Sequence, residues 1–569
     1  MRIHRMFSVL LLLLFAAGSS WAGTIHVPGD QPTIQAAIDA ASQYDTVLIA
    51  AGVYDEPLNI DTRSDLVIAG VDAATTILKA STTLPWNVAS YGSSRQTMVR
   101  IVTSTNITLS NLTLDCDLIK GNNVMGILLW DAGGSVKNNI LKNMSVADAS
   151  GGYYEITAYV RAISYTDLSR AEVSFTGNTF VDPGRVGIVA HGFVDIDVVQ
   201  NTFYKTTSDF GYAMEIGSQS VGSVSGNIIH GYNTPAASDG SNSAGIYIEN
   251  AYTAGTVGLT KSVSVVDNEV YDCQWALYAG NEFDGYAGDV DMELTVSGNN
   301  FHDNLDGAVI VTDEDRENGS SVTAAFENNT LSDNGAYGYF IFSRGDGDIT
   351  ATLEGDFVNS QDTGIYLADY ATTVSASSYQ LTVSGCDLSG NASYGVVNDY
   401  AAVTVNASGN WWGSSDPSVV SGDIAGEVDY TPWLASGSDS DPGSAGFQGD
   451  FSAVWVDDDS PQSGTTGRVS EGIELVSGST VNVAPGTYEE QIRIDGKSVD
   501  LVGAGIGNSI IEAVPVANRV TYSVTQWNGS ARTIDACIGI TGPATVNVSG
   551  FTIDGKGLGP DNFYGVHFF

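Results

Sequence analysis

Basic residues are scarce in this sequence. Its 569 residues include 22 Lys and Arg against 66 Asp and Glu, which gives a formal net charge of −44. Because phosphate binding needs clustered Lys and Arg, this balance excludes nucleic acid as a partner. Two interpretations of the acidity stay open: a solvated surface that keeps the protein soluble, and capture of Ca²⁺ by carboxylates in turns.

Cysteine and proline are scarce as well. The four cysteines lie far apart and form no Cys-x-x-Cys pair, so we expect buried thiols rather than disulfides or a zinc site: Cys116, Cys273, Cys386 and Cys537. The 14 prolines are outnumbered by 65 glycines. Together with abundant Val, Thr, Ser and Asn, this composition indicates short strands and tight turns.

Long apolar runs are confined to the first 22 residues. The stretch MRIHRMFSVLLLLLFAAGSSWA carries Arg2 and Arg5, an apolar core and the small residues Ser20 and Ala22, the pattern of a cleaved secretory signal peptide. No later run approaches the roughly 18 apolar residues of a membrane span. We therefore expect a signal peptide at 1–22, no membrane span in this chain, and a secreted or cell-surface protein.

What the sequence does have is internal repetition. Short apolar segments such as GIYIEN (245–250) and GIYLAD (364–369) recur about every 30 residues. A second series interleaves with them, in which an alternating strand is followed by Asn, as in VSFTGNTF (173–180) and LTVSGNNF (294–301). Asn tolerates the left-handed backbone conformation, so we expect it at the same bend in each repeat, stacked amide on amide.

This pattern predicts an all-β fold, a right-handed parallel β-helix of roughly 10–13 coils. A β-sandwich is the alternative, but its strands recur every 8–12 residues, a shorter period than the one observed. Residues 33–52 begin with apolar residues at helical spacing, at Ile34, Ala37, Ile38 and Ala41. We expect a short helix there that covers the N-terminal end of the solenoid.

The opening segment occurs twice. TVNVAPGTYEEQIRI (480–494) matches TVLIAAGVYDEPLNI (46–60), and we expect its acids Glu489 and Glu490 at corners of the coil. The predicted domains follow from this match: a β-helix at 23–434, a Gly/Ser/Asp-rich linker at 435–455 and an incomplete second β-helix at 456–569. Since this second unit stops after its first coils, we expect the chain to be part of a longer tandem protein.

The segment TIQAAIDAA…DTVLIAAGVYDEPLNI (33–60) and the repeats after it resemble secreted right-handed β-helix proteins of the pectin lyase-like superfamily. The opening is especially similar to that of pectin methylesterases. The resemblance covers nearly the whole chain after the signal peptide and implies the fold. It leaves the activity open, because the superfamily includes lyases, hydrolases, esterases, epimerases and proteins with no known chemistry.

One stretch resembles an esterase motif. GDFVNSQDTGIY (355–366) is similar to the esterase GYQDTLY through Gln361, Asp362 and Thr363. The resemblance implies a second Asp as partner and an Arg, yet the next coil has Asn391 where that Asp should fall, and no Arg lies between Arg344 and Arg468. The motif is incomplete, and the alternative is a plain turn between two coils.

Aligning the repeats places polar residues in a column just past each strand. Asp369 and Asp399 lie on adjacent coils, which stack about 4.8 Å apart, close to the ~5 Å separation of a retaining glycosidase pair. Asp313, Asp315 and Asp369 could hold Ca²⁺, and Arg344 is the one base directly after a central strand. The alternative is that these acids only form turns.

Further residues of the column are candidate ligand contacts, because aromatic faces stack on sugar rings: Tyr252, Phe283, Tyr370, Tyr400 and His191. Two functions follow. In the first, a monomeric solenoid binds or processes polysaccharide, as a lyase, hydrolase or esterase if it is an enzyme. In the second, it is a noncatalytic adhesin-like protein whose solenoid is a spacer, which the repeated unit favours.

Overall fold

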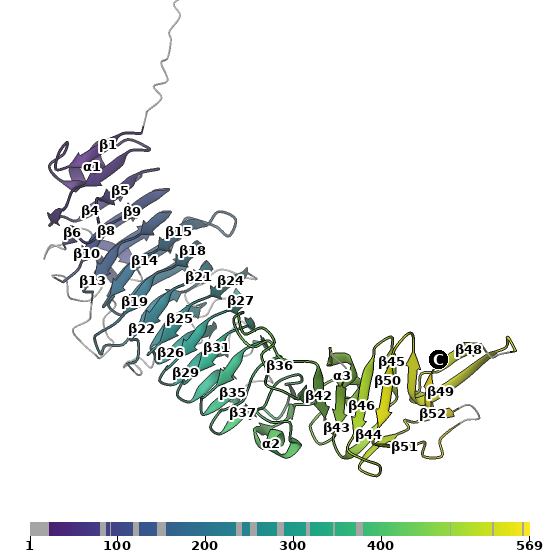
Figure 1. The fold of residues 1–569 in the computed structure, drawn as a ribbon. Coiled ribbons are helices and arrows are strands. Elements are labelled where there is room, and N and C mark those ends of the chain that lie inside the picture. The colour runs from purple at the N-terminus through teal and green to yellow at the C-terminus, as the bar shows by residue number, and fades with distance from the viewer. Residues whose placement is uncertain are drawn as a thin grey trace, which may run out of the picture.

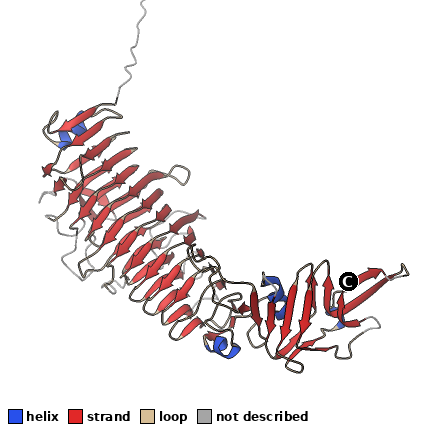
Figure 2. Ribbon diagram, viewed as in Figure 1, coloured by secondary structure: helices blue, strands red, loops and turns tan. Residues whose placement is uncertain are grey.

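The computed structural model describes residues 22–79, 87–90, 93–117, 124–144, 155–234, 242–250, 259–281, 290–313, 319–344, 347–370, 379–477, 480–525, 528–559 and 563–568. The predicted signal peptide, apart from Ala22, lies outside these residues. Figure 1 shows an elongated molecule in which coils of short strands follow one another, with the strands from β42 onward continuing in a different direction from those before them. Figure 2 shows that strands dominate throughout and that helices are few and short.

Three long sheets run the length of the first solenoid. Sheet A consists, in spatial order, of β1 (Thr24–Val27), β2 (Thr46–Ile49), β5 (Val67–Gly70), β9 (Ile107–Ser110), β12 (Gly134–Lys137), β15 (Ala171–Thr176), β18 (Val194–Val199), β21 (Val221–Ser225), β24 (Leu259–Val266), β27 (Val290–Ser297), β30 (Val322–Glu327), β33 (Ile349–Glu354), β36 (Tyr379–Ser384), β38 (Val405–Asn406) and β40 (Val428–Asp429). Its paired strands are parallel, so backbone hydrogen bonds run from coil to coil.

Sheet B consists of β3 (Gly52–Tyr54), β6 (Thr76–Lys79), β10 (Thr113–Asp115), β13 (Ile140–Lys142), β16 (Thr179–Val181), β19 (Thr202–Tyr204), β22 (Ile228–His230), β25 (Glu269–Tyr271), β28 (Asn300–His302), β31 (Thr330–Ser332) and β34 (Phe357–Asn359). Its strands have three or four residues, and those from β13 to β31 follow the Asn bend. Each coil therefore contributes one strand to sheet A and, one turn later, one to sheet B.

Sheet C completes each coil. It consists of β4 (Leu58–Asp61), β8 (Ser93–Val102), β11 (Val124–Trp130), β14 (Ile156–Ala162), β17 (Val186–Gly192), β20 (Tyr212–Ile216), β23 (Ala244–Glu249), β26 (Trp275–Asn281), β29 (Gly307–Asp313), β32 (Tyr337–Ser343), β35 (Thr363–Asp369), β37 (Tyr394–Asn398) and β39 (Ile424–Gly426), with β7 (Asn87–Ser90) antiparallel to β8. The parallel β-helix expected from the repeat is thus the observed architecture.

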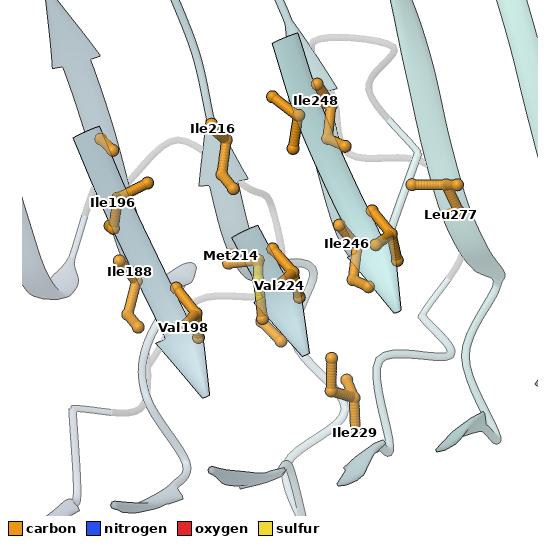
Figure 3. Packing of buried hydrophobic residues seen from close by; sticks show 14 of the residues in the cluster. Ile188, Ile196, Val198, Met214, Ile216, Val224, Ile229, Ile246, Ile248 and Leu277 are labelled. Atoms are coloured by element: carbon orange, nitrogen blue, oxygen red, sulfur yellow. The ribbon is translucent and has the colours of Figure 1, made fainter. Parts of the chain in front are cut away.

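The core lies inside the solenoid, where the inward residues of the three sheets meet. One cluster of buried side chains extends from Val27 to Trp433. Figure 3 shows Ile196 of sheet A beside Ile188 of sheet C and, further along, Val224 of sheet A beside Met214 of sheet C. Burying one such side chain stabilises the fold by about 1.5–3 kcal/mol, and each coil obtains that burial from its neighbours. The four cysteines are buried free thiols, as predicted.

The predicted Asn stack is present at the bend between sheets A and B. It comprises Asn139, Asn178, Asn201, Asn227, Asn268, Asn299 and Asn329. Each side-chain amide donates to the Oδ1 of the next, at 2.9–3.1 Å. Asp356 occupies the next position, where its Oδ1 accepts from the backbone and side-chain amides of Asn329 at 2.6 and 3.1 Å.

Short helices open both strand assemblies. α1 (Ile34–Ala40) buries Ile34, Ala37 and Ile38 against the first coil, as predicted. α3 (Arg468–Leu475) stands at the corresponding place of the second assembly. The remaining helices are α2 (Pro417–Gly422) and a 3₁₀ turn, η1 (Val516–Asn518).

A glutamate from the repeated motif caps each opening helix. The Glu56 carboxylate accepts from the backbone N–H groups of Ile34 and Gln35 at 2.8 and 3.0 Å. The Glu490 carboxylate accepts from those of Val469 and Ser470 at the same two distances. A helix begins with N–H groups that lack partners within the helix, and a carboxylate satisfies them. Glu490 is therefore a cap, whereas Glu489 is an exposed strand residue.

Removing either cap destabilises the end it holds. We expect Glu56→Ala and Glu490→Ala each to cost about 1–2 kcal/mol, because two helix N–H groups lose their acceptor. The measurement is hydrogen exchange of the α1 and α3 amides, which speeds up in the matching variant alone. Glu489→Ala serves as the control, since its exposed ion pair with Lys556 contributes little. Equal effects of Glu489→Ala and Glu490→Ala would contradict the capping role.

Beyond residue 432 the strands belong to three smaller sheets. The first contains β41 (Trp433–Leu434), β42 (Ala453–Val456), β43 (Thr480–Val483), β46 (Val499–Gly503) and β50 (Val546–Ser549); the second β44 (Gly486–Glu489), β47 (Ser509–Glu512) and β51 (Phe551–Asp554); the third β45 (Ile492–Asp495), β48 (Tyr522–Thr525), β49 (Ala531–Thr541) and β52 (Phe563–Phe568). The pair β41·β42 is antiparallel, while β42·β43 is parallel again. The domain boundaries at 434 and 455 stay a prediction.

The Gly/Ser/Asp-rich stretch packs back on the first solenoid. Phe447 is buried, lies edge-on to Phe357 at 5.3 Å and donates its N–H to the carbonyl of Gly355 at 2.6 Å. Further along, Arg468 of α3 forms a buried ion pair with Asp429 of β40 at 2.6 Å. These contacts join the two strand assemblies.

Candidate functional site

The outward face of sheet C carries a second set of apolar side chains. Along β17, Ile188 and Ala190 belong to the interior core, while Val189 between them belongs to a separate cluster with Tyr159, Tyr212 and Phe340. Side chains of a strand alternate between its two faces, so this separate cluster lies on the face away from the core. These side chains are buried as well, so the outer face of sheet C is covered at this cluster rather than exposed.

Aromatic rings form most of this face. We call six of them the aromatic platform: Tyr247, Tyr278, Tyr337, Phe340, Tyr366 and Tyr370. Tyr247 and Tyr278, on adjacent coils, stack at 4.9 Å. Further along, Phe340 stacks on Tyr337 at 4.8 Å and on Tyr366 at 5.6 Å. The tyrosines are half-buried, and Tyr370 is 40% exposed.

Charged groups lie at the end of the platform. The Arg344 guanidinium stands 4.8 Å above the ring of Tyr370 and 5.2 Å above that of Phe342, a cation–π geometry. The phenol of Tyr366 donates to the carboxylate of Asp399, and this hydrogen bond raises the pKa of Tyr366 above its ordinary value. Arg344 and Asp399, both candidates from the sequence, therefore border the platform.

The strand register separates the two predicted catalytic acids. Leu367 pairs with Asn398, which places Asp369 opposite Tyr400 rather than Asp399. Neighbouring positions of a strand point to opposite faces, so the two carboxylates do not face one another across the coil. A two-carboxylate mechanism at this pair stays a prediction.

The predicted Ca²⁺ ligands are also spread out. Asp313 pairs with Ser343 and Ser343 pairs with Asp369, so the two acids lie two coils apart in one column. Asp313 is buried and accepts from Ser343 Oγ at 3.2 Å and from the Gly347 N–H at 3.1 Å. Asp315 lies outside the described residues, as do Tyr252 and Phe283. The Ca²⁺ site stays a prediction.

The remaining candidates have structural partners. Gln361 is buried and donates to the carbonyl of Leu331 at 3.1 Å, and Asp362 accepts from Ser393 Oγ at 2.6 Å, as expected for a turn between coils. Tyr400 is buried and meets Tyr379 edge-on at 4.8 Å. Of the predicted ring contacts that the structure describes, Tyr370 is thus the exposed one.

A polar group occupies the same face nearer the N-terminus. His191 of β17, Glu215 of β20 and Glu249 of β23 come from three successive coils, and we call them the His–Glu–Glu cluster. His191 Nε2 lies 2.7 Å from Glu215 Oε1 and 3.8 Å from Glu249 Oε1. The side chains of His191 and Glu249 are 6% and 3% exposed, whereas that of Glu215 is 18% exposed.

The protonation states of the cluster follow from its burial. Desolvation lowers the pKa of His191, although Glu215 acts in the opposite direction. Burial is the largest influence on Glu215 and would raise its pKa, but the hydrogen bond and charge interaction with His191, together with the charges of Arg185 and Lys261, bring the pKa below its ordinary value. These directions correspond to a neutral imidazole beside an ionised carboxylate.

A buried lysine lies beneath the cluster. Lys261 of β24 is fully buried and donates to the carbonyl oxygens of Ile216 and of Glu249, the latter at 2.6 Å. Burial lowers the pKa of Lys261 to about 7. The sequence reasoning identified His191 but missed Glu215 and Lys261, although a lone charge within each apolar strand, as in AMEIGS (213–218), was the available signal.

Part of the chain matches a known family of β-helix proteins. Residues 126–377 match the family model described as "Right handed beta helix region". This stretch contains the aromatic platform and the His–Glu–Glu cluster. The protein is a right-handed parallel β-helix, as the sequence predicted. No curated protein sequence matches the chain.

Solved structures whose backbone follows a similar path include two epimerases and an exopolygalacturonase. The periplasmic alginate epimerase AlgG is 10% identical, with 72% of this chain and 83% of AlgG covered and a TM-score of 0.40. The family 28 exopolygalacturonase of Yersinia enterocolitica is 14% identical, with 73% and 77% covered and a TM-score of 0.29. The A-module of the mannuronan C-5 epimerase AlgE6 of Azotobacter vinelandii is 12% identical, with 94% of each chain covered and a TM-score of 0.20.

The helices of the described residues are all short. The longest, α3, has 8 residues, and none of those described could cross a membrane.

Proposed function

We propose that this protein is a secreted or cell-surface β-helix that binds polysaccharide along the aromatic platform of sheet C. The observation that supports the proposal is the row of half-buried tyrosines on β23, β26, β32 and β35, interrupted by Ile310 on β29 and flanked by Arg344 and Asp399. Sugars combine apolar C–H faces with hydroxyl groups, and tyrosine offers an apolar ring with a polar tip. Because the rings repeat with the coils, a polymer that runs along the solenoid meets several of them.

The direction of the platform favours a long ligand over a small one. Tyr247 and Tyr366 belong to β23 and β35, which are four strands apart in sheet C. At about 4.8 Å per strand this distance is roughly 19 Å. A monosaccharide would contact one or two rings, whereas an oligosaccharide would contact the whole row, so we expect affinity to rise with chain length.

Binding depends on the platform and not on aromatic residues in general. We expect Tyr278→Ala and Tyr366→Ala each to weaken oligosaccharide binding by about tenfold, since an aromatic contact contributes about 1.4 kcal/mol. A glycan array identifies the ligand, and isothermal titration with that oligosaccharide measures each variant. Tyr271→Ala is the matched control, because Tyr271 stacks in the same way on sheet B, between His230 and His302.

Two outcomes would count against the proposal. Equal losses in Tyr271→Ala and Tyr278→Ala would show that the platform is not the binding surface. Absence of binding across neutral and anionic glycans would favour the second function, a noncatalytic adhesin-like spacer. One observation supports that alternative: the cap-helix motif occurs twice, 434 residues apart, as expected for a chain that gains length by repeating a structural unit.

A further inference from the structure

We propose that the His–Glu–Glu cluster is a binding site for a divalent first-row transition-metal ion, with Zn²⁺ and Mn²⁺ as the best-suited ions. One imidazole nitrogen and two carboxylate oxygens, all within 4.8 Å of one another, come from the ends of three neighbouring strands. Catalytic metal sites commonly use three such protein ligands and leave the remaining positions to water or substrate.

The donor atoms pack against the backbone of a glycine. Ile216 pairs with Ala190 and with Ile248, so Gly217 lies between His191 and Glu249 in the sheet. A Cβ atom at position 217 would stand 2.1 Å from Glu249 Oε1 and 2.6 Å from His191 Nε2. Any other residue type would place its Cβ on these donor atoms and displace them. A glycine at this position therefore lets both side chains come together there.

The donor set selects among metals. Ca²⁺ takes six to eight oxygen ligands, and an imidazole is a poor member of such a shell. A nitrogen with two carboxylates suits Zn²⁺, Mn²⁺ or Fe²⁺. The cluster opens to solvent on the side of Glu215, which gives an ion a path and leaves positions for water or a sugar oxygen.

The surrounding charges set the affinity. Two carboxylates are held within 4 Å of a single imidazole nitrogen, a concentration of negative charge that a cation would neutralise. Arg161, Arg185 and Lys261 act on the same groups from neighbouring coils and oppose an incoming ion. We therefore expect a reversible ion rather than one that survives extensive dialysis against chelator.

The experiment uses the full chain, stripped with chelator and titrated in the absence of glycan. Isothermal titration with ZnCl₂ and with MnCl₂ is expected to give one equivalent bound, and CaCl₂ to bind far more weakly. His191→Gln and Glu249→Gln should each weaken binding by about 100-fold or more. His302→Gln is the matched control, because this histidine lies outside the cluster with Asp303 and Glu269 at 2.8 and 3.5 Å. It should leave the Zn²⁺ affinity unchanged.

Two further variants keep the test decisive. Gly217→Ala introduces one methyl group at the convergence point and should abolish binding even though all three ligands remain. Glu215→Gln keeps the shape of the side chain and serves if His191→Gln melts early by circular dichroism. With Co²⁺ in place of Zn²⁺, visible absorption bands that disappear in His191→Gln would report direct coordination.

The proposal is wrong if no stoichiometric Zn²⁺ or Mn²⁺ binding is found, as would hold for a hydrogen-bonded cluster that acts only in proton transfer. It is equally wrong if His191→Gln binds like the unmodified protein, or if His302→Gln loses as much. Each result is independent of glycan binding, which the platform variants Tyr278→Ala and Tyr366→Ala test separately.

Discussion

Replacing Asp356 by Asn is expected to stabilise the first solenoid by about 4 kcal/mol at pH 8.5 and by about 2 kcal/mol at pH 5.5. Asp356 is the one carboxylate in the described Asn stack, and its side chain is fully buried. Burial raises the pKa of Asp356 to about 7, against 3.8 in a solvated chain. Asn has the same shape without the charge.

The pH dependence follows from the direction of this shift. A carboxyl whose pKa is raised by folding contributes its full stability below pH 3.8, where it is protonated in both states. That stability is lost as the pH rises toward 7, because the unfolded chain ionises freely while the folded one resists. Above about pH 7 the loss is complete. The unmodified protein therefore becomes less stable relative to Asp356→Asn between pH 5.5 and 8.5.

Denaturant unfolding of both proteins at the two pH values provides the measurement. The hydrogen bonds are preserved, since an Asn at this position accepts from the amides of Asn329 and can donate to the phenol oxygen of Tyr339, which now bonds Asp356 Oδ2 at 2.7 Å. Asn299→Asp is the mirror-image control and should lose stability at high pH. A pH-independent difference between Asp356→Asn and the unmodified protein would show that Asp356 is ionised in the fold.

Truncating Asn268 is expected to cost about 4 kcal/mol. Asn268 lies in the middle of the stack, where its amide donates to the Val224 carbonyl and to Asn299 Oδ1, both at 2.9 Å. Its Oδ1 accepts from the backbone and side-chain amides of Asn227 at 3.0 and 2.9 Å. Ala leaves several of these buried groups without a partner, and each such group costs about 1–3 kcal/mol.

The same denaturant titration measures this variant. Thr260→Ala, an exposed residue of the neighbouring strand β24, should change the unfolding free energy by less than about 0.5 kcal/mol. Hydrogen exchange should show the damage on the coils of Asn227 and Asn299 as well as at the substituted bend, because the amides are linked in series. A loss confined to one coil would contradict the view that the stack couples its members.

Features set by local sequence were predictable. The repeat period predicted the parallel β-helix. Helical spacing at Ile34, Ala37 and Ile38 predicted α1, and the recurring Asn predicted the stack. Each of these follows from short-range pattern and the alternation of strand faces. The α3 helix was missed because Gly467 and Gly472 interrupt its pattern, although Val469 and Ile473 keep the four-residue spacing of Ile34 and Ile38.

Features set by register between coils were not predictable. Loops of different length precede each strand. The residue at which a motif begins therefore does not determine which residue of the neighbouring strand it pairs with. Gly364 and Gly395 occupy the same column, and this moves Asp369 one place away from Asp399. The His–Glu–Glu cluster depends on the same unseen register. Asp356 was missed although GDF (355–357) follows the pattern of the Asn-bearing bends, because the residue type differs.

The junction between the two strand assemblies has a mechanical consequence. Tension along the solenoid is shared at every coil by the backbone hydrogen bonds of sheets A, B and C. Between the assemblies, the two-residue pair β41·β42, the Arg468–Asp429 ion pair and the packing of Phe447 take the load. A pulling force would part these first and release residues 435–452, roughly 60 Å of extended chain, while both strand assemblies stay folded. The junction would then lengthen under force before either strand assembly unfolds.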